Sequence, residues 1–138
     1  MVKLIDMWKK PFTLEHGLYT LALAIALGIR FVNLGALSLT DFEAGYALEA
    51  LNISNGLPGV LQSNPAYTHL TTVLFFILGG ANFWARFWPA LAGVCLVLAP
   101  WFLRERIGRL PALVLAFGLA LDPGMNAISR LAGGPMLA

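Results

Sequence analysis

Two long apolar stretches with charged residues at their ends dominate the pattern along the chain. One runs from Leu14 to Leu34 and the other from Phe87 to Leu103. A helix of about 20 apolar residues crosses a bilayer core of ~30 Å. The pattern therefore predicts an all-α membrane protein with spans at 14–34 and 87–103, and a weaker third span at 110–128 that "DPG" interrupts near its far end.

The segment 36–85, between the first two spans, is neither continuously apolar nor typical of a loop. Thr40 to Leu51 has helical spacing, and Thr40 with Glu43 three residues later is typical of a capping box at a helix start. "NISNGLPG" then interrupts the helical pattern. Tyr67 to Gly80 is apolar again but short for a full crossing, so we interpret it as a helix at or in the membrane surface, with a short span as the alternative.

Composition supports a membrane protein. Of the 138 residues, 59% are hydrophobic and 12% charged, with a mean hydropathy of +0.77, whereas a soluble domain carries roughly 25% charged residues. A net charge of +2, with basic residues clustered at apolar boundaries, argues against nucleic-acid binding. The single Cys95 excludes a disulfide framework within the chain.

Charge placement predicts the topology. Lysines precede the first span and three arginines, Arg104, Arg106 and Arg109, follow the second. Basic residues favour the cytoplasm, so two crossings between them place 36–85 on the outer side and the N-terminus inside. The first apolar run continues to Leu34 without a small-x-small cleavage site, which favours an uncleaved anchor over a signal peptide. Arg30, near the outer end of this helix, is expected to extend its side chain toward the headgroups.

Asp41 and Glu43 are the candidate catalytic residues. Carboxylates at the membrane surface can act as a general base or hold a divalent metal ion, and the alternative is a pair of acids that caps a helix. Arg86 and Arg130 are candidates for phosphate binding, with interfacial anchoring as the alternative. His69 has no second ligand at metal-site spacing and is interpreted as an interfacial histidine.

The order of the motifs resembles one enzyme family. "LTDFEAGYALEA", "ARFWPALAG" and "SRLAGG" follow one another as in the N-terminal part of membrane glycosyltransferases of the GT-C fold, and most closely the bacterial glycosyltransferase family 39 group related to protein O-mannosyltransferases. The resemblance implies a polyprenyl-phosphate-linked sugar as donor, an acceptor outside the cytoplasm and a location in the bacterial inner membrane. It also implies that an acid of the first outer loop is the base or metal site.

Carried over by position, Glu43, Ala44, Tyr46 and Ala47 match the family's E-A-x-Y-A pattern. Phe42 stands where the family has an Asp, and Asp41 lies one place earlier. In "SRLAGGP", Ser129, Arg130 and Ala132 match S-R-x-A-R-x-D, whereas Gly133 and Pro135 stand at the positions of its second Arg and its Asp.

Family members are longer than this chain and have more spans. We therefore expect a fragment or truncated relative of such an enzyme, inactive as 138 isolated residues. The alternative is a non-catalytic accessory subunit in a larger membrane complex, whose small-residue-rich spans allow close helix contacts. The sequence does not identify the sugar, the acceptor or the partner.

Overall fold

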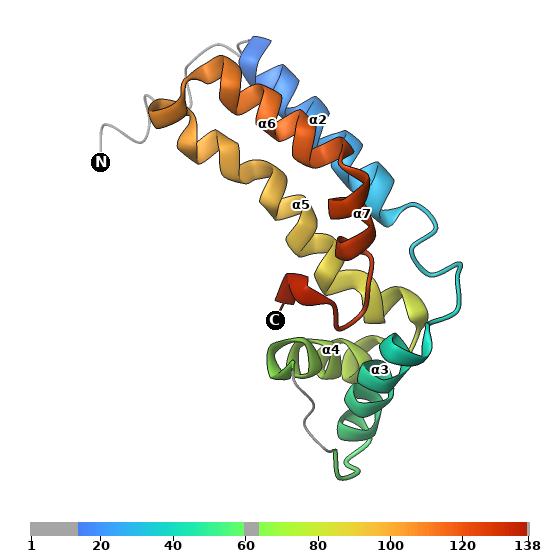
Figure 1. Ribbon diagram of the computed structural model, residues 1–138. Coiled ribbons are helices and arrows are strands. Elements are labelled where there is room, and N and C mark those ends of the chain that lie inside the picture. The colour runs from blue at the N-terminus through green and yellow to red at the C-terminus, as the bar shows by residue number, and fades with distance from the viewer. Residues whose placement is uncertain (1–13, 60–63, 138) are drawn as a thin grey trace.

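The computed structural model describes residues 14–59 and 64–137, and this part of the chain is all-helical, as predicted (Figure 1). The helices α2, α5 and α6 run side by side. The helices α3 and α4 lie together at the end of this bundle where α5 begins, and α7 and a short 3₁₀ turn lead the chain back toward them. The elements are α2 Leu14–Phe31, α3 Asp41–Ser54, α4 Pro65–Leu78, α5 Asn82–Ile107, α6 Arg109–Leu121, α7 Pro123–Ser129 and η1 Pro135–Leu137.

Two helices of the described residues, α2 and α5, are long and apolar enough to cross a membrane. The helices α6 and α7 reach that length only together, and they meet at a bend of 58°. The structure thus confirms two helices of membrane-spanning length and a weaker third candidate that is bent. The helix α4 is apolar but has only 14 residues.

The predicted bounds of the first two spans need correction. The first helix ends at Phe31 instead of residue 34, and the chain turns through Asn33, which has a positive φ of 55°. The second helix extends beyond 87–103 at both ends and contains Arg86 and Arg104. Both arginines have partners: Arg86 is buried against Glu43, and Arg104 lies over the ring of Trp101.

The third predicted span, 110–128, is interrupted at "DPG" as predicted, and the structure divides it into α6 and α7. Pro123 has no N–H, so the carbonyl of Leu119, four residues earlier, loses its helical donor. Arg30 Nη2 donates to that carbonyl at 3.1 Å, and the side chain of Asp122 accepts from the backbone N–H of Met125 to start α7. The break is therefore stabilised by a side chain from α2 and by a new helix cap.

The bundle packs through small side chains. Ala22 and Ala26 of α2 and Ala112, Ala116 and Ala120 of α6 recur every four residues and are fully buried. Such spacing lets helix backbones approach closely. On α5, Gly93 faces the contact between Arg30 and Ser129, where an added Cβ would lie 2.5 Å from Ser129 Cβ. Of the small residues expected at contacts, Ala24 and Gly28 are instead exposed.

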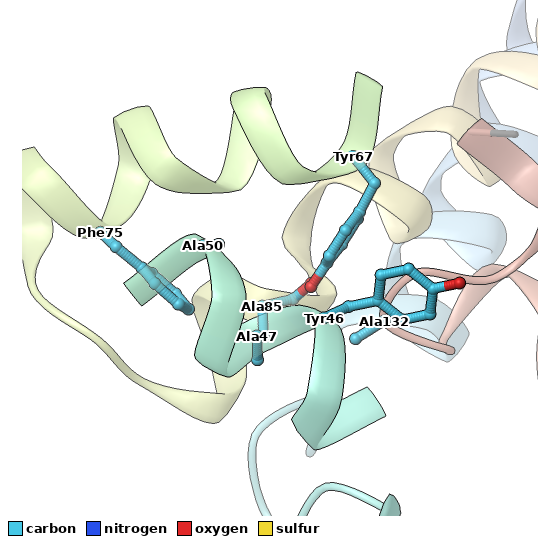
Figure 2. Close-up of a cluster of buried hydrophobic side chains, with 7 residues drawn as sticks. All are labelled: Tyr46, Ala47, Ala50, Tyr67, Phe75, Ala85 and Ala132. Carbon is cyan, nitrogen blue, oxygen red and sulfur yellow. The ribbon is translucent and has the colours of Figure 1, made fainter. Parts of the chain in front are cut away.

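A second core joins α3 and α4 to the bundle (Figure 2). It consists of Tyr46, Ala47, Ala50, Tyr67, Phe75, Ala85 and Ala132. The ring of Tyr67 points toward α5, and its hydroxyl donates to the carbonyl of Ala85 at 2.9 Å. That carbonyl would bond to residue 89 in a regular helix, but Pro89 has no N–H to offer. Burial raises the pKa of Tyr67 to about 12, so the hydroxyl keeps the proton that it donates.

Candidate functional site

The predicted capping box is confirmed at the start of α3. Thr40 is the N-cap, and its side-chain oxygen accepts from the backbone N–H of Glu43. The Glu43 carboxylate in turn accepts from the backbone N–H of Thr40 at 3.0 Å. This exchange fixes the direction in which the Glu43 side chain leaves the helix.

Glu43 is buried, with 1% of its surface exposed, and its two oxygens accept from five donors. Oε1 accepts from Arg86 Nε at 2.8 Å and from the backbone N–H of Ala132 at 2.9 Å. Oε2 accepts from Arg86 Nη2 at 2.8 Å and from the N–H and hydroxyl of Thr40, each at 3.0 Å. A carboxylate offers about four lone-pair sites, so these contacts use all of its accepting capacity.

The charge of Glu43 is stabilised by these contacts. Burial alone would raise the pKa of its carboxyl group, but the hydrogen bonds from Arg86, Thr40 and Ala132 outweigh burial and lower the pKa to about 2. A general base near neutral pH needs a higher pKa and a free lone pair. The geometry therefore disfavours Glu43 as a base.

Arg86, which binds the Glu43 carboxylate, also binds the segment that links α2 to α3. Its Nη1 donates to the carbonyls of Leu34 and Leu37 at 3.2 and 2.9 Å, and its Nη2 donates to that of Ser38 at 3.2 Å. We call the set Glu43, Arg86, Thr40 and Ala132 the Glu43 brace. It joins the start of α3, α5, the α2–α3 connection and the segment after α7.

Asp41 occupies the first position of α3 and is exposed. The structure forms an apolar groove of about 410 Å³ between α3 and the α4–α5 connection, and Asp41 does not line it but precedes the lining residues of α3 on the same helix. The groove-lining residues of α3 include Ala44, Gly45 and Leu48, at three, four and seven positions after Asp41. Residues with this spacing share one face of a helix. Asp41 is thus the accessible acid of the predicted pair, one helical turn before the groove-lining residues of α3.

The two predicted phosphate-binding arginines contact the protein itself. Arg130 donates to the carbonyls of Ile29, Val32 and Asn33, and so caps the end of α2. Arg86 belongs to the Glu43 brace. These contacts were not predicted, since the alternative to phosphate binding was interfacial anchoring, and phosphate binding by the two arginines stays a prediction.

Four residues that were not among the predicted site residues make contacts at this end of the molecule. Arg30, expected to reach the headgroups, is fully buried and donates to Ser129 Oγ at 3.2 Å. Gly133 has a φ of 66°, and its carbonyl accepts from Asn64 Nδ2 at 2.7 Å. The small residues of "SRLAGG" were the available signal, because tight contacts between backbone segments require them.

The contacts of Glu43 do not fit the predicted metal site, in which Asp41 and Glu43 together would bind a divalent ion. A metal ion could reach Glu43 only by displacing Arg86, Thr40 or Ala132 from its oxygens. Among the described residues, no group of three or more His, Cys, Asp or Glu side chains could hold a metal ion. Metal binding at Asp41 alone stays a prediction.

Comparison with known proteins adds no relative. No protein-family model, curated protein or solved structure matches this chain. The resemblance to the GT-C glycosyltransferases therefore stays a prediction from motif order.

Proposed function

We propose that this chain is part of a membrane-embedded glycosyltransferase that uses a polyprenyl-phosphate-linked sugar, with Asp41 as its base. In this proposal α2, α5 and the α6–α7 pair cross the inner membrane of a bacterium. The helices α3 and α4 then lie at its outer surface, and the N-terminus is cytoplasmic.

The observation that carries the proposal is the position of Asp41. It is an exposed acid in the first turn of α3, the helix whose later residues Ala44, Gly45 and Leu48 line an apolar groove and whose start is held by the Glu43 brace. A lipid-linked donor needs an apolar surface for its chain and a polar group where the sugar is transferred. In this proposal the groove supplies the first element, and Asp41, one helical turn before the groove-lining Ala44 and Gly45, supplies the second.

The proposed chemistry is a displacement at the sugar's anomeric carbon. Asp41 accepts the proton of the acceptor hydroxyl, whose oxygen forms the new bond to that carbon. The bond from the anomeric carbon to the phosphate oxygen breaks, and polyprenyl phosphate leaves with that electron pair. Glu43 and Arg86 hold the helix that carries Asp41 and do not touch the substrate.

A second candidate is a non-catalytic subunit of a membrane complex. The observation in its favour is that Glu43, Arg86 and Arg130, three of the four candidate site residues, make structural contacts. In this alternative Asp41 only stabilises the start of α3 through the helix dipole.

The test is sugar transfer by the full gene product in membranes, with polyprenyl-phosphate sugars as donors. We expect Asp41→Asn to lower transfer by roughly 10²-fold or more, since loss of a general base has effects of 10²–10⁴. Its melting temperature should stay close to that of the wild type. Glu105→Gln, which changes another exposed acid at the opposite end of α5, is the matched control and should keep full activity.

Unchanged transfer by Asp41→Asn would contradict the role of Asp41. No transfer by the wild type from any of these donors, together with stable co-purification of other membrane subunits, would favour the second candidate.

A further inference from the structure

A second apolar groove lies between α2 and α5, at the end of the bundle where α5 meets α6. It has a volume of about 360 Å³. The helix α2 contributes His16, Tyr19 and Leu23 to its lining, and α5 contributes Leu98, Trp101 and Phe102. This groove is distinct from the one that α3 lines, and the proposed function does not use it.

The groove extends from the charged end of the bundle into its apolar part. His16 and Leu23 are seven residues apart on α2, which corresponds to roughly 10 Å along a helix that rises 1.5 Å per residue. On α5, Leu98 lies about one turn before Trp101, farther from the arginines that end the helix. The arrangement suits a ligand with one polar end and an apolar chain.

Arg104 lies next to the polar end of the groove, over the ring of the lining residue Trp101. The guanidinium of Arg104 lies 3.7 Å from the centre of the Trp101 ring. Arg104 and Arg109 each approach Glu15 at 3.8 Å, which is too long for a hydrogen bond. Arg104 Nη1 has no hydrogen-bond partner in the structure, and 83% of the Arg109 side chain is exposed. Among the described residues from the start of α2 and the α5–α6 junction, three arginines, Arg104, Arg106 and Arg109, stand against two acids, Glu15 and Glu105.

Tyr19 gives an independent indication of a ligand. The residue is 95% buried, since only 5% of its surface is exposed, and it lines the groove. Its ring packs edge-on against Trp101 at 4.8 Å. Its hydroxyl oxygen is buried and has no hydrogen-bond partner among residues 14–59 and 64–137. A buried hydroxyl without a partner is unfavourable, and an ester carbonyl group at this depth would supply the acceptor.

We propose that this groove binds an anionic phospholipid from the leaflet on the arginine side. One acyl chain lies along Leu23, Leu98 and Phe102, and an ester carbonyl accepts from the Tyr19 hydroxyl. The phosphate lies at Arg104 and Arg109, whose free donors and positive charge match it. An anionic headgroup is favoured over a zwitterionic one because the arginines outnumber the acids.

The test is quenching of Trp101 fluorescence by brominated lipids in nanodiscs that contain the full gene product. The other tryptophans of this chain, Trp8, Trp84 and Trp88, and any in the rest of the gene product are replaced by Phe so that Trp101 alone reports. At equal mole fraction in phosphatidylcholine nanodiscs, brominated phosphatidylglycerol should quench Trp101 more strongly than brominated phosphatidylcholine. Arg109→Gln should reduce this preference about fivefold, as expected for the loss of one arginine near an anionic surface.

Two further variants make the test specific. Arg106→Gln removes the same charge near the α5–α6 junction but leaves in place the contacts of Arg104 and Arg109 with Glu15 and of Arg104 with Trp101, so it should change the preference less. Thr20→Phe fills the groove from an exposed position of α2 and should abolish the preference. Equal quenching by the two lipids, equal effects of Arg106→Gln and Arg109→Gln, or no quenching because another helix covers the groove would each overturn the proposal.

Discussion

The two ends of the bundle each pair a glutamate with an arginine of α5, but they do so differently. At one end, Glu43 and Arg86 meet at 2.8 Å, with 1% and 8% of their side chains exposed. At the other end, Glu15 faces Arg104 and Arg109 at 3.8 Å, with 21% of its side chain exposed. The same residue types thus form a rigid brace in one place and a loose cluster in the other.

The difference arises from what surrounds each pair. Removing two charges from water is costly, and their attraction compensates only where hydrogen bonds satisfy the remaining donors and acceptors. At Glu43 these bonds come from Thr40 and Ala132, and Arg86 also binds three backbone carbonyls. At Glu15, Oε1 has no hydrogen-bond partner in the structure. A well-bonded buried pair positions helices, whereas a loosely bonded pair keeps donors available for a ligand.

The largest predicted effect is the loss of the Glu43 charge. Glu43→Gln leaves the buried Arg86 without its counter-charge, and we expect it to lower the free energy of unfolding by about 3–5 kcal/mol. The matched change Glu15→Gln should cost only ~0–1 kcal/mol. Denaturant unfolding in lipid-free detergent micelles measures both. Similar losses in the two variants would remove the distinction between the ends.

Gly133 tests how tightly the segment after α7 is held against α3. Gly133→Ala forces an L-residue into a φ of 66° and places its Cβ against the Tyr46 ring. We expect a loss of about 2–4 kcal/mol in the free energy of unfolding, from backbone strain and overpacking together.

The matched control for this change is Gly118→Ala in α6. An added Cβ at Gly118 meets no atom within 4 Å, so this variant should be neutral or slightly more stable. A tolerated Gly133→Ala would show that the segment can move away from α3.

The smallest predicted effect compares two buried tyrosine hydroxyls. Tyr67→Phe removes the donor to the Ala85 carbonyl and should cost about 1–3 kcal/mol, because a buried acceptor is left unsatisfied. Tyr19→Phe, in lipid-free micelles, removes a hydroxyl without a partner and should cost nothing. A greater loss from Tyr19→Phe than from Tyr67→Phe would contradict these assignments.

Much of the fold could be predicted from local sequence. Apolar length located α2 and α5, and Thr40 with Glu43 located the start of α3, because helix caps and membrane spans depend on neighbouring residues. The "DPG" sequence indicated the bend at Pro123. It did not indicate that Arg30 donates to the free carbonyl of Leu119, since these residues are 89 positions apart.

The candidate site was harder to predict for the same reason. Asp41 and Glu43 look equivalent in sequence, and only the long-range contacts with Arg86 and Ala132 separate a buried brace from an exposed acid. Arg130 likewise is close in space to the end of α2, about 100 residues away in sequence. The contact partners of such side chains depend on tertiary packing, which local sequence patterns do not determine.

A double-mutant cycle between Glu43 and Arg86 tests the central claim most directly. The free energy of unfolding is measured for the wild type, Glu43→Gln, Arg86→Met and the double variant, and the same cycle is made for Glu15→Gln and Arg104→Met. The account predicts a coupling of about 2–3 kcal/mol for Glu43–Arg86 and below ~0.5 kcal/mol for Glu15–Arg104. A coupling near zero for Glu43–Arg86, or equal couplings at the two ends, would contradict it.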